Sequence, residues 1–306
     1  MHKKVIKYLE NNFKGDVKGK TIIITGGNAG IGFESAKTCA YLGMNVILAV
    51  RNLEKGEKAR EKILEINNDA LISVMKLDVS EESSIKDFVK EITNKNIDID
   101  VFYHNAGVYR LPYEEKEGRE IVVSTNFYGQ VMLTSLLLPY LHSLPHDVKV
   151  VFTSSIAAKW AKINKEALLP NQKLSKQVRY ANSKMLDAYL FKYLFDNDRS
   201  NVSYFLVHPG VTGTDLFNKA YGKVFAKVVN VFMKICTNPL WKSSLSIVKV
   251  LDKDAIPGSF YGPSKMLNVY GYPKDNHFLN KRYKEVEEII HEAEKIVKYE
   301  LPTIKK

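Results

Sequence analysis

The stretch Thr21-Ile22-Ile23-Ile24-Thr25-Gly26-Gly27-Asn28-Ala29-Gly30-Ile31-Gly32 decides the fold of this chain. Its first five residues are β-branched with an apolar centre, which is typical of a strand buried on both faces. A glycine-rich turn follows, and helical periodicity then runs from about residue 30 to 42. Such a turn lets the backbone approach a pyrophosphate, whose charge is stabilised at the helix N-terminus. The stretch therefore predicts dinucleotide binding, although Gly-x-x-x-Gly-x-Gly departs from the Gly-x-Gly-x-x-Gly spacing.

Strand-like and helix-like segments alternate along the rest of the chain. Strands are predicted at 21–25, 46–50, 71–77, 99–103, 149–153 and 202–207, with a last strand and turn at 258–263. Helices are predicted at 3–13, 30–42, 53–66, from Ser80 with Glu81 and Glu82 in the first turn, 121–141, 178–195 and 280–298. This alternation predicts a doubly wound, Rossmann-type α/β fold, a three-layer sandwich with a mostly parallel sheet between helices. We expect one domain over 1–306, with a core at about 18–265 and the helices at 3–13 and 280–298 as appendages.

The amino-acid composition is typical of a folded globular protein. Hydrophobic residues make up 45% of the 306 residues and aromatic residues 11%, which supports a sizeable core. No run of 18 or more apolar residues is present, so we expect no membrane-spanning helix and no signal peptide. Cys39 and Cys236 are too few for a disulfide framework, and a reducing cytoplasm is expected.

The net charge of +11 does not predict nucleic-acid binding, because the lysines are scattered rather than gathered in a block with aromatic residues. A basic surface also suits an anionic cofactor. The seven histidines show no metal-ligand spacing. His142 and His146 are four apart, but Pro145 disrupts the helix between them. We therefore expect neither nucleic acid nor a metal.

The end of the second predicted strand indicates which dinucleotide is bound. An NAD site usually carries an acidic residue here for the ribose hydroxyls. This chain has Val50 and then Arg51. A guanidinium suits the 2′-phosphate of NADP through charge-assisted hydrogen bonds. We predict a preference for NADP(H), with NAD(H) as the alternative.

Polar and glycine residues follow the later strands as well. In an open parallel sheet, the carboxyl ends of the strands form the ligand crevice. Residues at those ends join the glycine turn as candidate cofactor-binding residues. The full set is Gly26, Asn28, Gly30, Ile31, Gly32, Arg51, Asp78, Val79, Asn105, Ala106, Gly107, Tyr180, Lys184, Pro209, Gly210, Thr212 and Thr214.

Tyr180 and Lys184 are the strongest candidate for proton transfer. Four residues apart on the predicted helix at 178–195, they share one face, and a nearby ammonium favours the phenolate form of a tyrosine. The Tyr-x-x-x-Lys pattern also occurs at Tyr261/Lys265 and Tyr270/Lys274. Glycine and proline interrupt both later copies, so neither is expected to share a helical face. Only the first pair is predicted to act as a proton donor and acceptor.

In combination, these motifs resemble the short-chain dehydrogenase/reductase superfamily, over roughly residues 18–265. Ser155 precedes Tyr180 by 25 residues, a longer gap than in shorter members. That gap, together with Arg51, is similar to the retinol-dehydrogenase-like branch. The usual Asn-Asn-Ala-Gly is replaced by His104-Asn105-Ala106-Gly107, and we interpret His104 as a structural histidine that ends a buried strand. His208 is interpreted as structural too.

The resemblance implies a mechanism. Tyr180 would be the general acid in carbonyl reduction and the base in alcohol oxidation. Lys184 would favour its phenolate and bond the nicotinamide ribose, and Ser155 would donate a hydrogen bond to the substrate oxygen. Asn126 would hold a water that links Lys184 to solvent. Alternatives are a double-bond reductase of the protochlorophyllide-reductase type, and a regulator that binds the dinucleotide without catalysis.

Substrate identity is expected to depend on three variable stretches, at 108–110, 156–179 and 211–241. The third carries apolar residues with interspersed lysines. It is interpreted as a lid over a hydrophobic small-molecule substrate. The alternative interpretation is a peripheral membrane contact through 217–236. The segment could also serve both as a lid and as a membrane contact. Assembly as a homodimer is also left open by the sequence.

Overall fold

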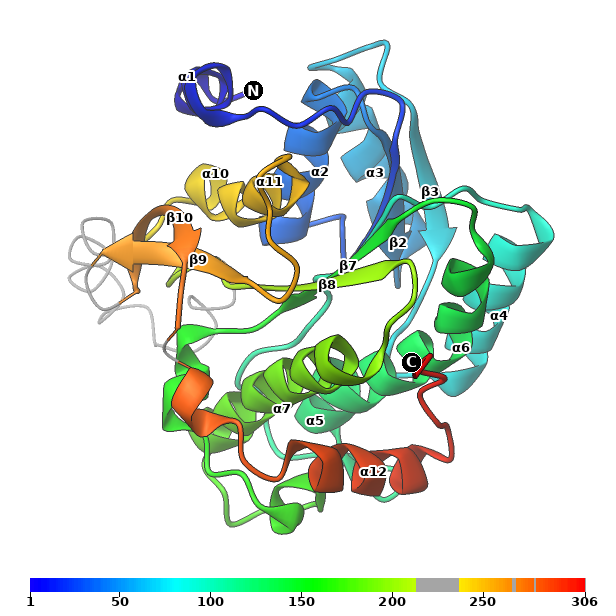
Figure 1. The fold of residues 1–306 in the computed structure, drawn as a ribbon, viewed down its shortest axis with the longest axis vertical. Helices are drawn as coiled ribbons and strands as arrows, with labels where there is room; N and C mark the ends of the chain where they lie inside the picture. Colours follow the sequence, from blue (N-terminus) through cyan, green and yellow to red (C-terminus); the bar gives the residue numbers. More distant parts are fainter. Residues whose placement is uncertain (213–236, 266–267, 278, 306) are drawn as a thin grey trace.

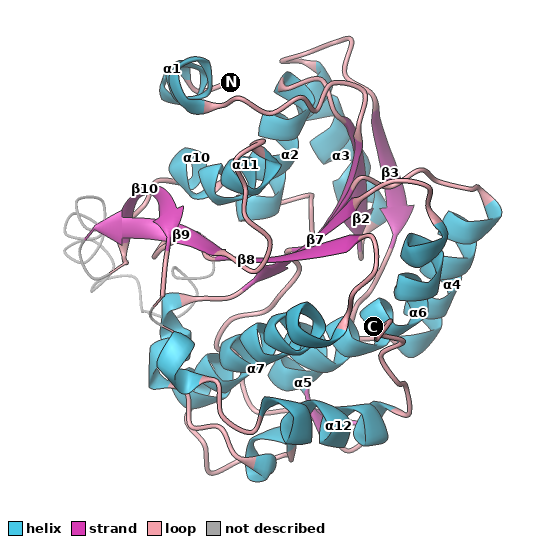
Figure 2. Ribbon diagram, in the orientation of Figure 1, coloured by secondary structure: helices cyan, strands magenta, loops and turns pink. Residues whose placement is uncertain are grey.

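The computed structural model describes residues 1–212, 237–265, 268–277 and 279–305. Thr214 and the segment 217–236, predicted as a lid or membrane contact, lie outside these residues. A central eight-stranded sheet has the order β10-β9-β8-β7-β4-β1-β2-β3 (Figures 1 and 2). The pairings are parallel except for the antiparallel pair of β9 and β10. The strands are β1 (Thr21–Thr25), β2 (Asn45–Val50), β3 (Ile72–Lys76), β4 (Val101–His104), β7 (Val148–Thr153), β8 (Val202–Val207), β9 (Phe260–Lys265) and β10 (Tyr270–Asp275).

Helices cover both faces of the sheet, as predicted for a doubly wound fold (Figure 2). One face packs against α2 (Gly30–Tyr41), α3 (Leu53–Leu64) and α11 (Leu245–Leu251). The other packs against α4 (Glu82–Asn94), α6 (Gly129–Ser143), α7 (Lys176–Asn197) and α12 (Val286–Val297). The remaining described elements are α1 (Lys3–Asn12), β5 (Glu115–Lys116), β6 (Arg119–Glu120), α5 (Ile121–Val123), the π-helical turn η1 (Ser124–Tyr128), α10 (Leu240–Ser243) and the 3₁₀ turns η2 (Ile156–Trp160), η3 (Lys165–Leu168) and η4 (Asn280–Arg282).

Strand β1 explains why its sequence is continuously apolar. Ile22 and Ile24 belong to the core on one face of the sheet, whereas Ile23 belongs to the core on the other. All three are fully buried. Side chains alternate between the faces of a strand, so a strand covered on both sides needs apolar residues at every position.

Several predicted boundaries were wrong. Helix α4 begins at Glu82, with Glu81 as its N-cap rather than a first-turn residue. Ser80 does not cap it, because the Ser80 hydroxyl donates to Asp78 Oδ1 at 2.7 Å. The C-terminal helix begins at Val286 rather than near 280, since a 3₁₀ turn precedes it.

The helical stretch Ile121–Ser143 is longer and less regular than predicted. It combines α5, the π-helical turn η1 and α6. By length and composition it is apolar enough to span a membrane, a test that a buried core helix also passes. However, 89% of its tested window is buried inside the protein. That burial is typical of a core helix, which is apolar on all sides because all of its sides are buried.

Candidate active site

The turn from β1 to α2 leaves room and hydrogen-bond donors for an anion. Gly26 and Gly30 adopt positive φ angles of 67° and 56°. A Cβ on Gly30 would meet no heavy atom within 4 Å, and the N-cap Ala29 contributes no side-chain cap. The first N–H groups of α2 are therefore available to a ligand, and helix N-termini favour phosphates. This geometry fits the pyrophosphate of a dinucleotide.

Close packing fixes the same turn against the end of β4. A Cβ on Gly32 would lie 2.5 Å from Asn105 Nδ2 and 2.6 Å from the carbonyl of Gly26, so only glycine fits there. The Thr25 hydroxyl accepts hydrogen bonds from the N–H groups of Asn105 and Ala106, at 3.0 and 2.9 Å. Asn105 in turn donates to the carbonyl of Thr25 at 2.9 Å. These bonds hold the glycine turn and the Asn105-Ala106-Gly107 segment side by side.

The ends of β2 and β3 carry the charged residues predicted for the adenosine side of the cofactor. The Arg51 side chain is 75% exposed, with its Nε 3.8 Å from Asp78 Oδ2. Lys76 Nζ donates to the carbonyl of Arg51 at 2.6 Å, which places a second cation at this edge. Val79, by contrast, is buried in the core. Asn28 lies in the turn and is half-buried.

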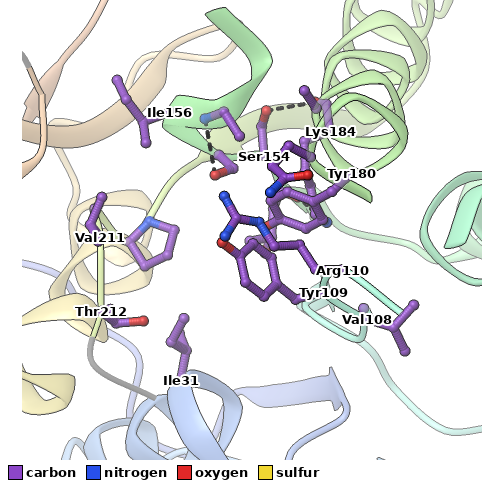
Figure 3. A pocket seen from close by; sticks show the side chains of 18 of the residues that line it. Ile31, Val108, Tyr109, Arg110, Ser154, Ile156, Tyr180, Lys184, Val211 and Thr212 are labelled. Carbon is purple, nitrogen blue, oxygen red and sulfur yellow. Dashed lines mark hydrogen bonds between the residues drawn. The ribbon is translucent and has the colours of Figure 1, made fainter. Parts of the chain in front are cut away.

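A cavity of about 480 Å³ opens at the carboxyl ends of β4, β7 and β8. Tyr180, Lys184 and Ser155 line it together (Figure 3). Predicted cofactor residues also reach it, namely Ile31, Asn105, Gly107, Pro209, Gly210 and Thr212. The rest of the lining is mainly apolar and includes Ile156, Trp160, Val178, Val211 and Val269. The structure thus brings three of the four predicted catalytic side chains to one largely apolar cavity, and the fourth, Asn126, does not line it.

The three variable stretches meet at this cavity in their described parts. Val108, Tyr109 and Arg110 form one wall. The Tyr109 ring packs edge-on against the Tyr180 ring, with centroids 4.6 Å apart and an interplanar angle of 85°. Figure 3 shows these two rings close together, with Val211 on the opposite side of the cavity. Val108, Tyr109 and Arg110 therefore line the cavity next to Tyr180.

Lys184 is a buried cation that donates to two groups among the residues that the structure describes. Its Nζ donates to the carbonyl of Thr153 at 3.1 Å and to Asp187 Oδ2 at 2.8 Å. Burial lowers the pKa of Lys184, but the Asp187 carboxylate and the Tyr180 phenol act in the opposite direction and the net direction is upward. Lys184 is therefore held as an ammonium beside Tyr180.

Ser155 and Ser154 have different surroundings. The Ser155 hydroxyl accepts from the N–H of Ala157 at 3.2 Å, so it caps the turn η2 and lines the cavity as well. Ser154 is buried and donates to the carbonyl of Lys184 at 2.7 Å. That bond ties the end of β7 to α7. The capping role leaves the Ser155 hydroxyl proton available to a substrate oxygen, because capping uses only a lone pair.

Asn126 lies behind the cavity, in the π-helical turn. Its Oδ1 accepts from the N–H of Val108 at 2.7 Å. Its Nδ2 donates to the carbonyl of Val108 and to Ser183 Oγ, both at 2.9 Å. A Cβ on Gly107 would lie 3.1 Å from Asn126 Oδ1 and 3.4 Å from Lys184 Nζ. Asn126 therefore fixes the segment next to Lys184, a positioning function that its predicted water-holding role did not include.

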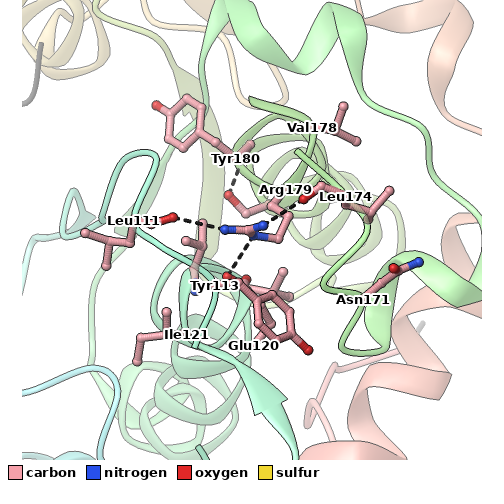
Figure 4. A network of polar contacts seen from close by, with 12 residues as sticks. Leu111, Tyr113, Glu120, Ile121, Asn171, Leu174, Val178, Arg179 and Tyr180 are labelled. Carbon is pink, nitrogen blue, oxygen red and sulfur yellow. Dashed lines mark hydrogen bonds and ion pairs between the residues drawn. The ribbon is translucent and has the colours of Figure 1, made fainter. Parts of the chain in front are cut away.

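A buried ion pair between Arg179 and Glu120 contacts Leu111, the residue that follows the cavity wall at 108–110 (Figure 4). Arg179, which precedes Tyr180, donates to Glu120 Oε1 at 3.1 Å and to the carbonyls of Leu174 and Leu111 at 2.7 and 3.0 Å. The side chains of Arg179 and Glu120 are 5% and 3% exposed. Burial raises the pKa of Glu120 despite these contacts. One guanidinium thus joins three segments around Tyr180.

Both histidines interpreted as structural are buried. His104 stacks on Phe152 with centroids 4.7 Å apart, and its Nε2 is 3.3 Å from the Thr134 hydroxyl. Burial lowers the pKa of His104 to about 3, and burial with Lys159 lowers that of His208 to about 3. Each is therefore neutral at physiological pH. Within the described residues, no group of three His, Cys, Asp or Glu side chains is arranged to hold a metal ion.

Sequence reasoning missed several residues of the site. Asp187, Arg179 and Glu120 were not among the candidates, although Asp187 follows Lys184 by three residues on the same helical face. Asn238 was also missed. It donates to the carbonyl of Pro209 at 3.0 Å and accepts from the N–H of Gly271 at 3.0 Å, so it ties the end of β8 to β10. That contact spans distant segments, and no local pattern signals it.

Comparison with known proteins decides the family. The model of the short chain dehydrogenase family matches residues 20–223. This chain is a member of the short-chain dehydrogenases. This short-chain dehydrogenase belongs to the retinol-dehydrogenase-like branch, as its relatives show. The fold and the family predicted from its motifs are confirmed.

Human polyprenol dehydrogenase is 33% identical over 209 residues, covering 66% of this chain and 63% of that protein. Mouse retinol dehydrogenase 11 is 29% identical over 269 residues, covering 86% of this chain and 84% of that protein. A solved short-chain dehydrogenase from Shigella flexneri, complexed with NADP, is 26% identical with a TM-score of 0.55, covering 68% of this chain and 84% of that one. The chain therefore spans less than two thirds of the polyprenol enzyme and most of the retinol enzyme.

Proposed function

We propose that this short-chain dehydrogenase is an NADP(H)-dependent oxidoreductase that interconverts a carbonyl and an alcohol on an apolar substrate. The observation that carries the proposal is the meeting of Tyr180, Lys184 and Ser155 at one largely apolar cavity, at the carboxyl ends of three parallel strands. When bound, the nicotinamide supplies or accepts the hydride. The protein supplies the proton, the orientation and the apolar surroundings.

Tyr180 acts as the general acid or base. Its ring packs edge-on against Tyr109, and both Tyr180 and the Lys184 ammonium line the cavity. In reduction, the Tyr180 O–H bond breaks and the proton passes to the substrate oxygen. In oxidation, the phenolate takes the proton back. Ser155 donates a hydrogen bond to the same oxygen and stabilises negative charge that develops there.

The residues of the glycine turn, the ends of β2 and β3 and the end of β8 hold the cofactor. The uncapped N-terminus of α2 binds the pyrophosphate, and Gly26, Gly30 and Gly32 leave space for it. Arg51 and Lys76 bind the 2′-phosphate that distinguishes NADP from NAD. The NADP complex of the Shigella relative supports this preference.

An apolar substrate is supported by the cavity wall and by the relatives. Ile156, Trp160, Val178 and Val269 line the described part of the wall. Two of the relatives are named as dehydrogenases of polyprenol and of retinol, which are both apolar alcohols. Burial of such a chain against this wall stabilises the complex by about 0.8 kcal/mol per methylene.

The test measures oxidation of NADPH and NADH with a panel of apolar aldehydes, ketones and quinones. Wild type, Tyr180→Phe and Arg51→Ala are compared. We expect turnover of an apolar carbonyl with NADPH and its loss in Tyr180→Phe. Unchanged turnover in Tyr180→Phe contradicts the mechanism. A preference for NADH that Arg51→Ala leaves unaltered contradicts the cofactor assignment.

A further inference from the structure

Asp187 is a buried carboxylate that the proposed reaction does not yet use. It lies on α7 three residues after Lys184, and its side chain is fully buried. Its Oδ2 accepts from Lys184 Nζ at 2.8 Å. Its Oδ1 accepts no hydrogen bond within the described part of the chain. The carboxylate is therefore held by Lys184 alone, and an incompletely satisfied buried charge is costly to keep.

The contacts of Lys184 leave one of its hydrogen-bond donors for the cavity. An ammonium has three N–H donors. Asp187 and the carbonyl of Thr153 take two of them, at 2.8 and 3.1 Å. The third is left for the side where Gly107 and the cavity lie. The direction of that remaining donor depends on the two bonds that anchor the other side of the ammonium.

We propose that Asp187 is a positioning residue for the reaction, which fixes the Lys184 ammonium at the cavity and keeps it charged there. The inference rests on the proposed roles of Tyr180 and Lys184. A fully buried lysine without a counter-ion loses its proton readily, because burial disfavours the charged form. A neutral amine at Lys184 no longer stabilises the Tyr180 phenolate.

A second lysine–aspartate pair on the same helix shows what an ordinary surface pair looks like. Lys192 and Asp196 are 31% and 45% exposed, whereas Lys184 and Asp187 are 5% and 0% exposed. Exposed pairs contribute little, because water screens both charges. Asp196 is therefore a matched control on α7, with the same charge and the same type of partner.

The ionisation of Asp187 is expected to make its contact with Lys184 depend on pH. Burial raises the pKa of Asp187 to about 7, against the opposing effect of Lys184. The carboxylate therefore forms as pH rises through about 7 and is lost as pH falls through it. Tyr180 is the other titratable group that acts on Lys184, while β7 and η1 present the Thr153 carbonyl and the Asn126 amide, which are uncharged.

The first test follows the charge of Lys184 directly, without any turnover. Protein labelled with [ε-¹³C]lysine is titrated by NMR, and Lys184→Met assigns the Lys184 signal. In wild type, the signal is expected to shift near pH 7 as Asp187 ionises and to report an ammonium at higher pH. In Asp187→Asn, the lysine is expected to lose its proton at least about one pH unit lower than in wild type.

The second test follows the reaction and NADPH binding in the same variants. Asp187→Asn is expected to lower kcat/KM about 10- to 100-fold and to move the basic limb of the pH profile to lower pH. Asp187→Glu restores a carboxylate and should recover part of the loss, while Asp196→Asn should match wild type. NADPH affinity, measured by fluorescence, should weaken in Asp187→Asn through the displaced Lys184.

The outcomes separate this inference from the proposed function. A Lys184 titration and a pH profile in Asp187→Asn that match wild type overturn the positioning role. If Asp187→Asn does not fold, the wild-type Lys184 signal decides, because no shift near pH 7 also overturns it. Absence of turnover in wild type contradicts the proposed function, while the NMR titration still decides whether Asp187 controls Lys184.

Discussion

Replacement of Arg179 by methionine is expected to destabilise the protein and to loosen one wall of the cavity. The substitution removes three hydrogen bonds, to Glu120, Leu174 and Leu111. It also removes the guanidinium that lies 5.3 Å from the centre of the Tyr113 ring. Methionine retains the apolar stem of the side chain, so the loss is mainly electrostatic.

The magnitude follows from burial. Removing one partner of a buried ion pair costs about 3–5 kcal/mol, because the other charge is left in the interior. Glu120 keeps the N–H groups of Val122 and Val123 as partners, both at 3.0 Å, which offsets part of that cost. The carbonyls of Leu174 and Leu111 lose a charged donor, which adds to it. We expect a loss of about 4 kcal/mol, or about 8 °C in Tm at roughly 2 °C per kcal/mol for a chain of this size.

The assay combines urea and thermal unfolding with steady-state kinetics. Arg179→Met, Glu120→Gln and the double variant form a double-mutant cycle. Arg199→Met is the control, because Arg199 is exposed and lies just beyond the C-cap of α7. The double variant should be more stable than the sum of the single losses predicts, since neither charge is then left alone. With Leu111 released, kcat/KM for substrate should fall roughly 10- to 100-fold while NADPH affinity stays close to wild type.

Two results would refute this reasoning. A loss below about 1 kcal/mol in Arg179→Met would mean that the pair contributes no more than a surface pair. Additive losses in the double variant would mean that the two charges do not interact. Either outcome would remove the argument that this pair fixes the wall beside Tyr180.

Three further predictions concern the cofactor turn and the buried histidines. Arg51→Ala is expected to raise KM for NADPH about 10- to 100-fold and to leave KM for NADH nearly unchanged, because only NADPH carries the 2′-phosphate. Gly32→Ala is expected to abolish binding of both nucleotides in fluorescence titrations, because the added methyl lies 2.5 Å from Asn105 Nδ2. The free energy of unfolding should decrease as pH is lowered below about 6.5. The reason is that His104 and His208 protonate in the unfolded chain but have folded pKa values of about 3. Urea unfolding at pH 7 and pH 5 should show His104→Gln losing about 2 kcal/mol less than wild type on acidification, and an equal loss contradicts the assignment.

The sequence predicted those parts of the fold that are determined by local patterns. The bounds of β1 and β8 match the expected 21–25 and 202–207, because these strands are continuous apolar runs that end at turn residues. The later Tyr-x-x-x-Lys copies lie on β9 and β10 rather than on helices, as glycine and proline in them predicted. Helix starts were less predictable, since Ser80 bonds Asp78 instead of capping α4.

The parts that sequence reasoning missed depend on contacts between distant segments. The π-helical turn at Asn126 is stabilised by its amide bonds to Val108 and Ser183, 18 and 57 residues away. Strand β10 contains Gly271 and Pro273, which argue against a strand, yet it forms an edge paired with β9. The Arg179–Glu120 pair spans 59 residues. Local residue patterns carry no information about such pairings.

The central claim, that Tyr180 delivers the proton that accompanies hydride transfer, is tested most directly with NADPH deuterated at the nicotinamide C4 and an apolar aldehyde. In wild type, we expect deuterium on the carbinol carbon of the alcohol product, detected by mass spectrometry. In Tyr180→Phe, the rate should fall by a factor of about 10²–10⁴ while NADPH binding stays close to wild type. Deuterium transfer at the wild-type rate in Tyr180→Phe would contradict the account.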